Sequence, residues 1–208
     1  MGKFIEVPAN KMSLLNRKLK YGVGVNDASY MVTRKVGGKQ VVCPFYIKWN
    51  DMLERCYSER QIEKHPTYRG CSVAKEWLTF TNFRAWMEAQ EWQGMDLDKD
   101  IVNYGNKIYS ADNCRFVTGA LNSLLGDNAA KRGLYQQGVC YRKSSGKYEA
   151  QVMARGKVTY LGYFKTPEEA RVAYVVAKTE LIHQAADAHK DPAIAAGLRY
   201  YVKMTLSA

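Results

Sequence analysis

Between residues 30 and 90, hydrophobic positions first alternate with polar ones and then recur with helical spacing. Residues 30–42 alternate around a Gly37-Gly38 pair, which is typical of a β-hairpin. After Pro44, hydrophobic residues recur at steps of three and four, which predicts an amphipathic helix. These residues are Trp49, Met52, Leu53, Cys56 and Tyr57. A second helix is expected near residues 79–90, with Thr79 as its N-cap. The aromatic face shared by these helices is expected to form a core.

The pattern becomes shorter and more polar between residues 96 and 133. A loop is expected at 104–107, a strand at 114–117 and a helix from Thr118 to about Leu125. Residues 126–133 are polar and contain two glycines, which is typical of a linker.

Beyond the linker, three β-prone runs alternate with turns. The expected strands cover 138–143, 148–155 and 158–164, with turns at 144–146 and 156–157. The sequence Thr166-Pro167-Glu168-Glu169 predicts a capping box at the start of a long helix. Its buried face is expected to hold Ala170, Ala173, Tyr174, Ala177 and Leu181. The predicted fold class is α+β, with a three-stranded antiparallel sheet packed on one helix.

Charge narrows the range of partners. The formal net charge is +11, and residues 131–208 contain 13 Lys and Arg against 6 Asp and Glu. Such a field favours polyanions, because Lys and Arg release counterions when they bind phosphates.

No apolar run is long enough for a membrane span or placed as a secretory signal. The five cysteines are an odd number without a CxxC pair, which favours a reducing, cytoplasmic location. They are expected to be small buried hydrophobes, and a zinc site of Cys56, Cys71 and Cys114 is the alternative.

Residues 30–125 resemble the phage homing branch of the HNH (His-Me finger) nucleases. The resemblance rests on Asn113-Cys114-Arg115-Phe116-Val117-Thr118 followed by Asn122, and on a set of upstream positions. These positions are Trp49, Met52, Arg55, Cys56, Tyr57, Tyr68, Gly70, Trp77, Phe80 and Phe83. The family fold is a ββα unit that holds one divalent metal. The resemblance therefore implies an HNH-like ββα-metal module that hydrolyses phosphodiester bonds with Mg²⁺ or Mn²⁺.

The resemblance assigns roles to particular residues. Asp98 and Asn122 take the metal-ligand positions, and Asn113 takes the loop position that orients the general base. Lys99 stands where the family has its general-base histidine, and the three histidines of the chain lie outside this segment. A lysine is protonated at neutral pH, so it is expected to stabilise charge on the phosphate while Asp100 or a metal-bound water activates the nucleophile. The alternative is that these residues are turn residues and local caps.

Residues 135–185 resemble the DNA-binding domain of plant apetala-type and ethylene-response factors. The matching positions are Gly138-Val139, Gly146-Lys147-Tyr148, Leu161-Gly162-Tyr163-Phe164, Thr166 to Glu169 and the alanine-rich helix. In that fold the sheet lies in the DNA major groove and the helix packs behind it. The alternation then places Arg142, Gln151, Met153, Arg155 and Tyr160 on one sheet face, with Lys143, Lys147 and Lys157 near the turns. A merely solvated sheet face is the alternative.

Together these patterns predict a basic N-terminal arm (1–29), a nuclease-like module (30–126), a linker (127–134), a DNA-binding domain (135–189) and a tail (190–208). The expected partner is double-stranded DNA, with no membrane and no small-molecule substrate. The leading hypothesis is an HNH-like DNA endonuclease, acting in the cytoplasm of a phage host. The second is a non-catalytic DNA-binding protein, which the missing histidine supports. The third is a factor that acts on RNA or protein.

Overall fold

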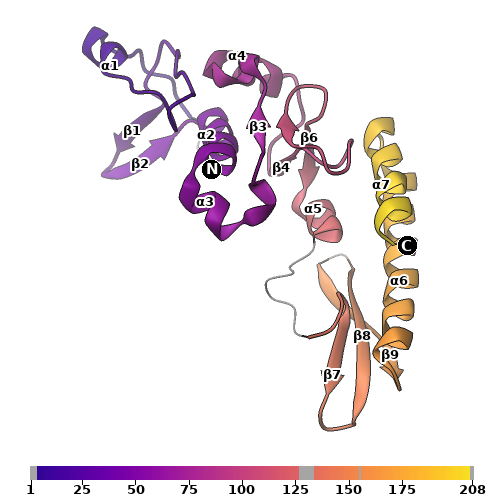
Figure 1. The fold of residues 1–208 in the computed structure, drawn as a ribbon. Helices are drawn as coiled ribbons and strands as arrows, with labels where there is room; N and C mark the ends of the chain where they lie inside the picture. The colour runs from indigo at the N-terminus through magenta and orange to yellow at the C-terminus, as the bar shows by residue number, and fades with distance from the viewer. Residues whose placement is uncertain (1–3, 127–133, 155, 207–208) are drawn as a thin grey trace. The chain divides into compact units, whose positions relative to one another are not determined.

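The computed structural model describes residues 4–126, 134–154 and 156–206. It has mixed helical and strand structure, including a three-stranded antiparallel sheet, which confirms the predicted α+β class (Figure 1). Two compact units divide the chain. The first comprises Met1–Asp100 and Gly105–Phe116, and the second comprises Ile101–Tyr104 and Val117–Ala208. Residues 127–133 of the predicted linker and Arg155, a predicted DNA contact, lie outside the part that the structure describes.

The first unit is built mainly from helices and short strands. Its helices are α1 (Lys11–Leu15), α2 (Pro44–Tyr57), α3 (Glu59–Lys64) and α4 (Phe80–Glu88), with 3₁₀ turns at Pro66–Tyr68 and Lys75–Leu78. Its strands are β1 (Thr33–Val36), β2 (Lys39–Val42), β3 (Ser72–Val73), β4 (Met95–Asp98) and β5 (Ile108–Tyr109). β1 and β2 are antiparallel, and Gly37 and Gly38 between them have φ of +56° and +77°. The predicted hairpin is therefore confirmed.

An aromatic core holds α2 and α4 together. Trp49, Met52, Phe80 and Phe83 are fully buried, and the Trp49 indole N–H donates to the carbonyl oxygen of Trp77 at 2.7 Å. Both helices predicted from the hydrophobic pattern are confirmed. Thr79 is the N-cap residue of α4, but its side chain makes no capping hydrogen bond.

The segment expected to be an N-terminal arm contributes to this unit. Ala28 is fully buried, and Phe4 packs against the core. The Arg17 guanidinium donates to the backbone carbonyl oxygens of Asn26, Ala28 and Tyr30. These bonds tie the segment down because a single side chain satisfies three carbonyls.

Strand β6 (Arg115–Thr118) crosses from the first unit into the second and pairs with β4. It leads directly into α5 (Gly119–Leu125), for which the Thr118 hydroxyl accepts a hydrogen bond from the Leu121 N–H. The predicted strand at 114–117 and the helix after it are confirmed. β3 and β5 form a short parallel pair.

The second unit contains the sheet β7 (Val139–Arg142), β8 (Lys147–Ala154) and β9 (Lys157–Phe164). The strands are antiparallel in the order β7-β8-β9, with a register irregularity between Ala150 and Gln151. Helix α6 (Pro167–Ala188) follows, and Thr166 and Glu169 form the reciprocal capping box. The three strands, the helix and its cap agree with the sequence prediction.

One face of this sheet packs on α6 (Figure 1). Ala150 and Val152 of β8 are buried, as are Ala170 and Tyr174 of α6. Gly138 has φ +87°, and a Cβ added there would lie 1.9 Å from the Tyr174 ring. Only glycine fits this close approach, which fixes the start of β7 against the helix.

Helix α7 (Pro192–Thr205) occupies the region expected to be a C-terminal tail. It packs on α6 through a core that includes Ile182, Ile194, Leu198 and Val202. Gly197 permits a close contact with the backbone oxygen of Ile101, since a Cβ at Gly197 would lie 1.8 Å from that atom. Among the residues described, no helix combines the length and the apolar character needed to cross a membrane.

Candidate nucleic-acid interface and the Lys99 network

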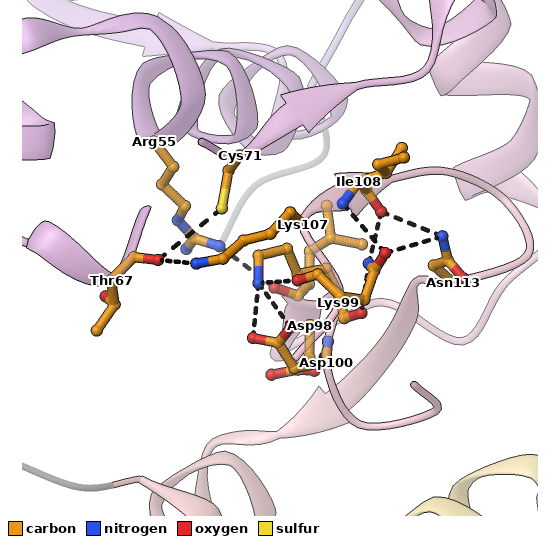
Figure 2. A network of polar contacts seen from close by, with 11 residues as sticks. Arg55, Thr67, Cys71, Asp98, Lys99, Asp100, Lys107, Ile108 and Asn113 are labelled. Atoms are coloured by element: carbon orange, nitrogen blue, oxygen red, sulfur yellow. Dashed lines mark hydrogen bonds and ion pairs between the residues drawn. The ribbon is translucent and has the colours of Figure 1, made fainter. Parts of the chain in front are cut away.

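Lys99 lies in the loop after β4 and is the centre of a polar network in the first unit (Figure 2). Its side chain is 6% exposed. The ammonium donates to both carboxylate oxygens of Asp100, at 2.6 and 2.7 Å, and to the carbonyl oxygen of Asn106 at 2.7 Å. An ammonium has three N–H donors. All three are therefore used inside the protein.

Asn106 organises the rest of this loop. Its amide donates to the carbonyl oxygens of Lys99 at 3.0 Å and Ile108 at 2.7 Å. Its side-chain oxygen accepts from the Ile108 N–H at 3.1 Å and from the Asn113 amide at 3.3 Å. Asn106 was predicted only to lie in a loop. An asparagine after glycine between two short strands is the only signal that pointed to it.

The two carboxylates of the network, those of Asp98 and Asp100, accept hydrogen bonds from different groups. The Asp98 Oδ1 atom accepts the Asp100 N–H at 2.7 Å, which closes a local turn at the end of β4. The Asp100 carboxylate is 45% exposed and contacts Lys99. Loss of solvent contact raises the pKa of Asp100 above its ordinary value, and the hydrogen bonds from Lys99 only partly offset this effect.

Further cations surround this loop. Arg55 donates to the Leu97 carbonyl oxygen at 3.3 Å, and its guanidinium lies over the Tyr68 ring. Lys107 donates to the Thr67 carbonyl oxygen at 2.8 Å (Figure 2). Each of these two hydrogen bonds goes to a backbone carbonyl, so Arg55 and Lys107 stabilise the backbone around the loop.

The arrangement fits a divalent metal poorly. Carboxylate oxygens suit Mg²⁺. Here both Asp100 oxygens bind the Lys99 ammonium, and a cation so close opposes a second positive charge. Within the described ranges, no cluster of three or more His, Cys, Asp or Glu side chains is placed to hold a metal.

The cysteines of the zinc alternative are buried thiols. Burial raises the pKa of both Cys56 and Cys114 to about 12, so both are protonated at neutral pH. Metals bind the thiolate and not the thiol. Cys43 and Cys71 are also buried, whereas Cys140 is only half-buried, so the expectation of small buried hydrophobes is met by four of the five cysteines.

The structure brings four of the predicted site residues together in the first unit. Asp98 ends β4, and Lys99, Asp100 and Asn113 follow it in the hydrogen-bonded segment that leads to β6 (Figure 2). Asn122, the other predicted metal ligand, is an exposed residue of α5 in the second unit.

The second unit presents an open sheet face opposite the one on α6. Residues directly opposite on neighbouring strands point to the same side. Glu149 is opposite Cys140 and Tyr163, Gln151 is opposite Tyr160, and Met153 is opposite Val158. We call this set, with Arg142 and Lys147, the open face. Its members are Cys140, Arg142, Lys147, Glu149, Gln151, Met153, Val158, Tyr160 and Tyr163.

Most of the predicted DNA contacts lie on or beside the open face. Arg142, Met153 and Tyr160 are exposed there, and Gln151 is half-buried. Lys147 is exposed on this face at the β7–β8 turn, while Lys143 and Lys157 are exposed at the two turns. The rings of Tyr160 and Tyr163 meet edge to face at 5.3 Å, and each side chain is about half exposed.

Arg142 and Glu149 form a forked ion pair across β7 and β8. The Arg142 Nε atom donates to one Glu149 oxygen at 2.6 Å, and Nη2 donates to the other at 2.8 Å. The hydrogen bonds from Arg142 lower the pKa of Glu149. Sequence reasoning missed Glu149, because its alignment with Arg142 depends on the strand register.

Charge on the sheet is almost all positive. Between residues 138 and 165 the sequence has six Lys and Arg and a single acid, Glu149. Since Arg142 neutralises that acid, the remaining cations are unbalanced within these strands and turns. Comparison of the chain with protein-family models, with curated proteins and with solved structures found no match.

Proposed function

We propose that this protein binds double-stranded DNA through the open face of its C-terminal sheet. One observation carries the proposal: the strands and turns from 138 to 165 combine six cations with a single acid, and that acid is already paired with Arg142. A surface of this kind attracts phosphates and releases their counterions. A β-ribbon also fits the width of the major groove.

The open face has the side chains that contact with a duplex requires. Lys147 lies at one end of this face, and Lys143 and Lys157 lie at its turns, where phosphate contacts would position the sheet. Gln151 and Arg142 carry donors that suit base edges, and Tyr160 adds an exposed aromatic surface.

A binding titration tests the proposal. Anisotropy of a labelled mixed-sequence duplex is measured between 50 and 200 mM salt, for the wild type and for Lys143→Ala/Lys147→Ala/Lys157→Ala. We expect tight binding by the wild type. The triple variant should bind more weakly, and its log-affinity should depend less steeply on log salt by about 0.9 for each lost phosphate contact.

A matched control removes three exposed lysines from the first unit, Lys35, Lys39 and Lys64. The control has the same net charge as the test variant, and its affinity should remain close to that of the wild type. Equal losses in both variants would place the contact elsewhere. No association at 50 mM salt would overturn the proposal, and full competition by structured RNA would favour an RNA partner.

Phosphodiester hydrolysis by an HNH-like ββα module is the second candidate. The observation that favours it is the order of elements, because β4 ends at Asp98, pairs with β6 and is followed through β6 by α5. The hydrogen bonds between Lys99 and Asp100 weigh against hydrolysis, because they occupy the donors and acceptors that a substrate or a metal would need. The alternative within this candidate is a non-catalytic scaffold that serves DNA binding.

A plasmid-nicking assay distinguishes the hydrolytic module from the non-catalytic scaffold. Supercoiled plasmid is incubated with the protein and Mg²⁺ or Mn²⁺, and Asp98→Ala is compared with Asp96→Ala. Asp96 is a fitting control, since it lies on the same strand with a half-exposed carboxylate near Lys48. Cleavage lost only in Asp98→Ala would support hydrolysis. Duplex binding without nicking would leave the protein as a DNA-binding protein alone.

A further inference from the structure

The pair of Arg142 and Glu149 joins an exposed group to a buried one. The Arg142 side chain is 48% exposed, whereas the Glu149 side chain is 8% exposed. Glu149 sits on the central strand, opposite Cys140 on one side and Tyr163 on the other. The carboxylate is thus held by the sheet, and the guanidinium reaches outward from it.

The fork leaves a defined part of the guanidinium available. Arginine has five N–H donors. Two of them, on Nε and Nη2, donate to Glu149. The outer edge keeps both N–H groups of Nη1 and one of Nη2, and among the described residues none of these has a protein partner. Two parallel donors at this edge match the O6 and N7 acceptors of guanine in the major groove.

Pairing also changes what Arg142 contributes to binding. An unpaired arginine attracts any phosphate, whatever the base sequence. Arg142 is neutralised by Glu149, so its long-range attraction for phosphates is small. The side chain is held in one orientation as well, which lowers the ordering cost of a directional contact.

We propose, resting on the DNA-binding function above, that Glu149 orients Arg142 to recognise a guanine in duplex DNA. Arg142 then contributes sequence specificity and little phosphate affinity. Glu149 is a positioning residue in this arrangement, since it acts through Arg142 and need not touch the DNA.

Selection from a duplex library with a randomised segment tests this inference. The wild-type protein should enrich sequences that contain a fixed G·C pair. Replacing that pair should weaken wild-type binding about 5- to 150-fold, the range of one good bidentate base contact. Arg142→Ala should lose discrimination at that one position and retain preferences elsewhere.

Glu149→Gln is the decisive variant, because it keeps the shape of the side chain and removes its charge. It should lose discrimination at the same base pair as Arg142→Ala. In the Arg142→Ala background it should change that discrimination no further. A purely structural role for Glu149 would instead lower affinity for all sequences alike. Arg142→Lys keeps the charge without the fork, and should bind DNA but not discriminate.

The outcomes separate this inference from the function beneath it. Full guanine discrimination in Arg142→Ala or in Glu149→Gln would overturn the inference and leave DNA binding intact. Selection of no preferred base by a wild-type protein that binds duplexes would do the same. Failure of the wild-type protein to bind any duplex would overturn both. Circular dichroism of each variant, with Lys147→Ala at an exposed position of the same sheet as the control, verifies the fold.

Discussion

Two cation–carboxylate pairs of this protein, Lys99 with Asp100 and Arg142 with Glu149, have opposite exposures. In the first unit the Lys99 side chain is 6% exposed and the Asp100 side chain is 45% exposed. In the second unit the Arg142 side chain is 48% exposed and the Glu149 side chain is 8% exposed. The buried member of each pair is held by the fold, and the other member faces solvent.

The difference shows which group each region offers to a partner. Lys99 uses all three of its donors within the protein, so this pair exposes the Asp100 carboxylate and no unused donor of Lys99. Arg142 uses two of its five donors, so the sheet exposes a guanidinium edge. The second arrangement offers hydrogen-bond donors to a partner, whereas the first offers acceptors.

Replacing Lys99 is expected to have the largest effect. Lys99→Met keeps the aliphatic stem but leaves the Asn106 carbonyl oxygen and Asp100 without their shared donor. We expect a loss of about 2–3 kcal/mol in the free energy of unfolding, since the bonds involve a buried charge. Tryptophan fluorescence in a urea titration measures this selectively, because all four tryptophans lie in the first unit.

Lys107→Met is the control for that experiment. Lys107 is exposed and makes one hydrogen bond to a backbone carbonyl, so its loss should cost no more than about 0.5 kcal/mol. Equal effects of the two substitutions would show that the Lys99 network adds nothing beyond a surface contact.

Replacing Asn106 should have the next largest effect. Asn106→Ala removes a side chain that bonds the backbones of Lys99 and Ile108 and the amide of Asn113. We expect a loss of about 1–2 kcal/mol in unfolding free energy, again by tryptophan fluorescence. Asn82→Ala is the control, because Asn82 is exposed and makes one bond to the Glu76 carbonyl. A cost for Asn106→Ala as small as that of the control would contradict its central place in the loop.

Local patterns predicted most of the fold. Helices α2 and α4, the β1–β2 hairpin and the capping box of α6 follow from spacing within a few residues, where side-chain periodicity and turn chemistry decide the conformation. The buried face of α6 was predicted only in part. Ala170 and Tyr174 are buried as expected, but Ala173, Ala177 and Leu181 are only half-buried. Beyond Tyr174, the buried residues of α6 follow at steps of four, because this part of the helix also packs against α7. They are Lys178, Ile182 and Ala186.

The candidate sites were harder to predict, because their bonds join residues through tertiary structure. The sequence places Lys99 and Asp100 side by side but does not reveal that Asn106 completes the coordination of the ammonium. Likewise, Arg142 and Glu149 meet only in the register that pairs Arg142 with Lys147. A shift of one residue would place Glu149 on the face that packs against α6.

The salt dependence of DNA binding is expected to differ between two cations of the open face. Lys147→Ala should flatten the slope of log-affinity against log salt by about 0.9, as for one lost phosphate contact. Arg142→Ala should leave the slope almost unchanged, because the proposed contact of Arg142 is to a base and not to a phosphate. Titrations at four salt concentrations measure both slopes. Equal flattening by the two substitutions would show that Arg142 contacts a phosphate.

Carboxyl titration should give the smallest effect and the most direct view of the two pairs. The pKa of Asp100 should lie above its ordinary value of 3.8, because loss of solvent contact outweighs the bonds from Lys99. The pKa of Glu149 should lie below its ordinary value of 4.5, because of the hydrogen bonds from Arg142. Carbon-13 NMR of the side-chain carboxyl groups measures both.

These opposite directions imply opposite effects of pH on stability. A lowered pKa means that the Glu149 carboxylate contributes stability above about pH 4.5, and this stability is lost as the pH falls through the pKa of the folded state. A raised pKa means that the folded state binds the Asp100 proton more tightly than the unfolded chain, so this group favours folding as the pH falls. Arg142→Ala should raise the pKa of Glu149, and Lys99→Met should raise that of Asp100 further. A shift in the same direction for both wild-type carboxyls would show that the two pairs do not differ in the way their exposures indicate.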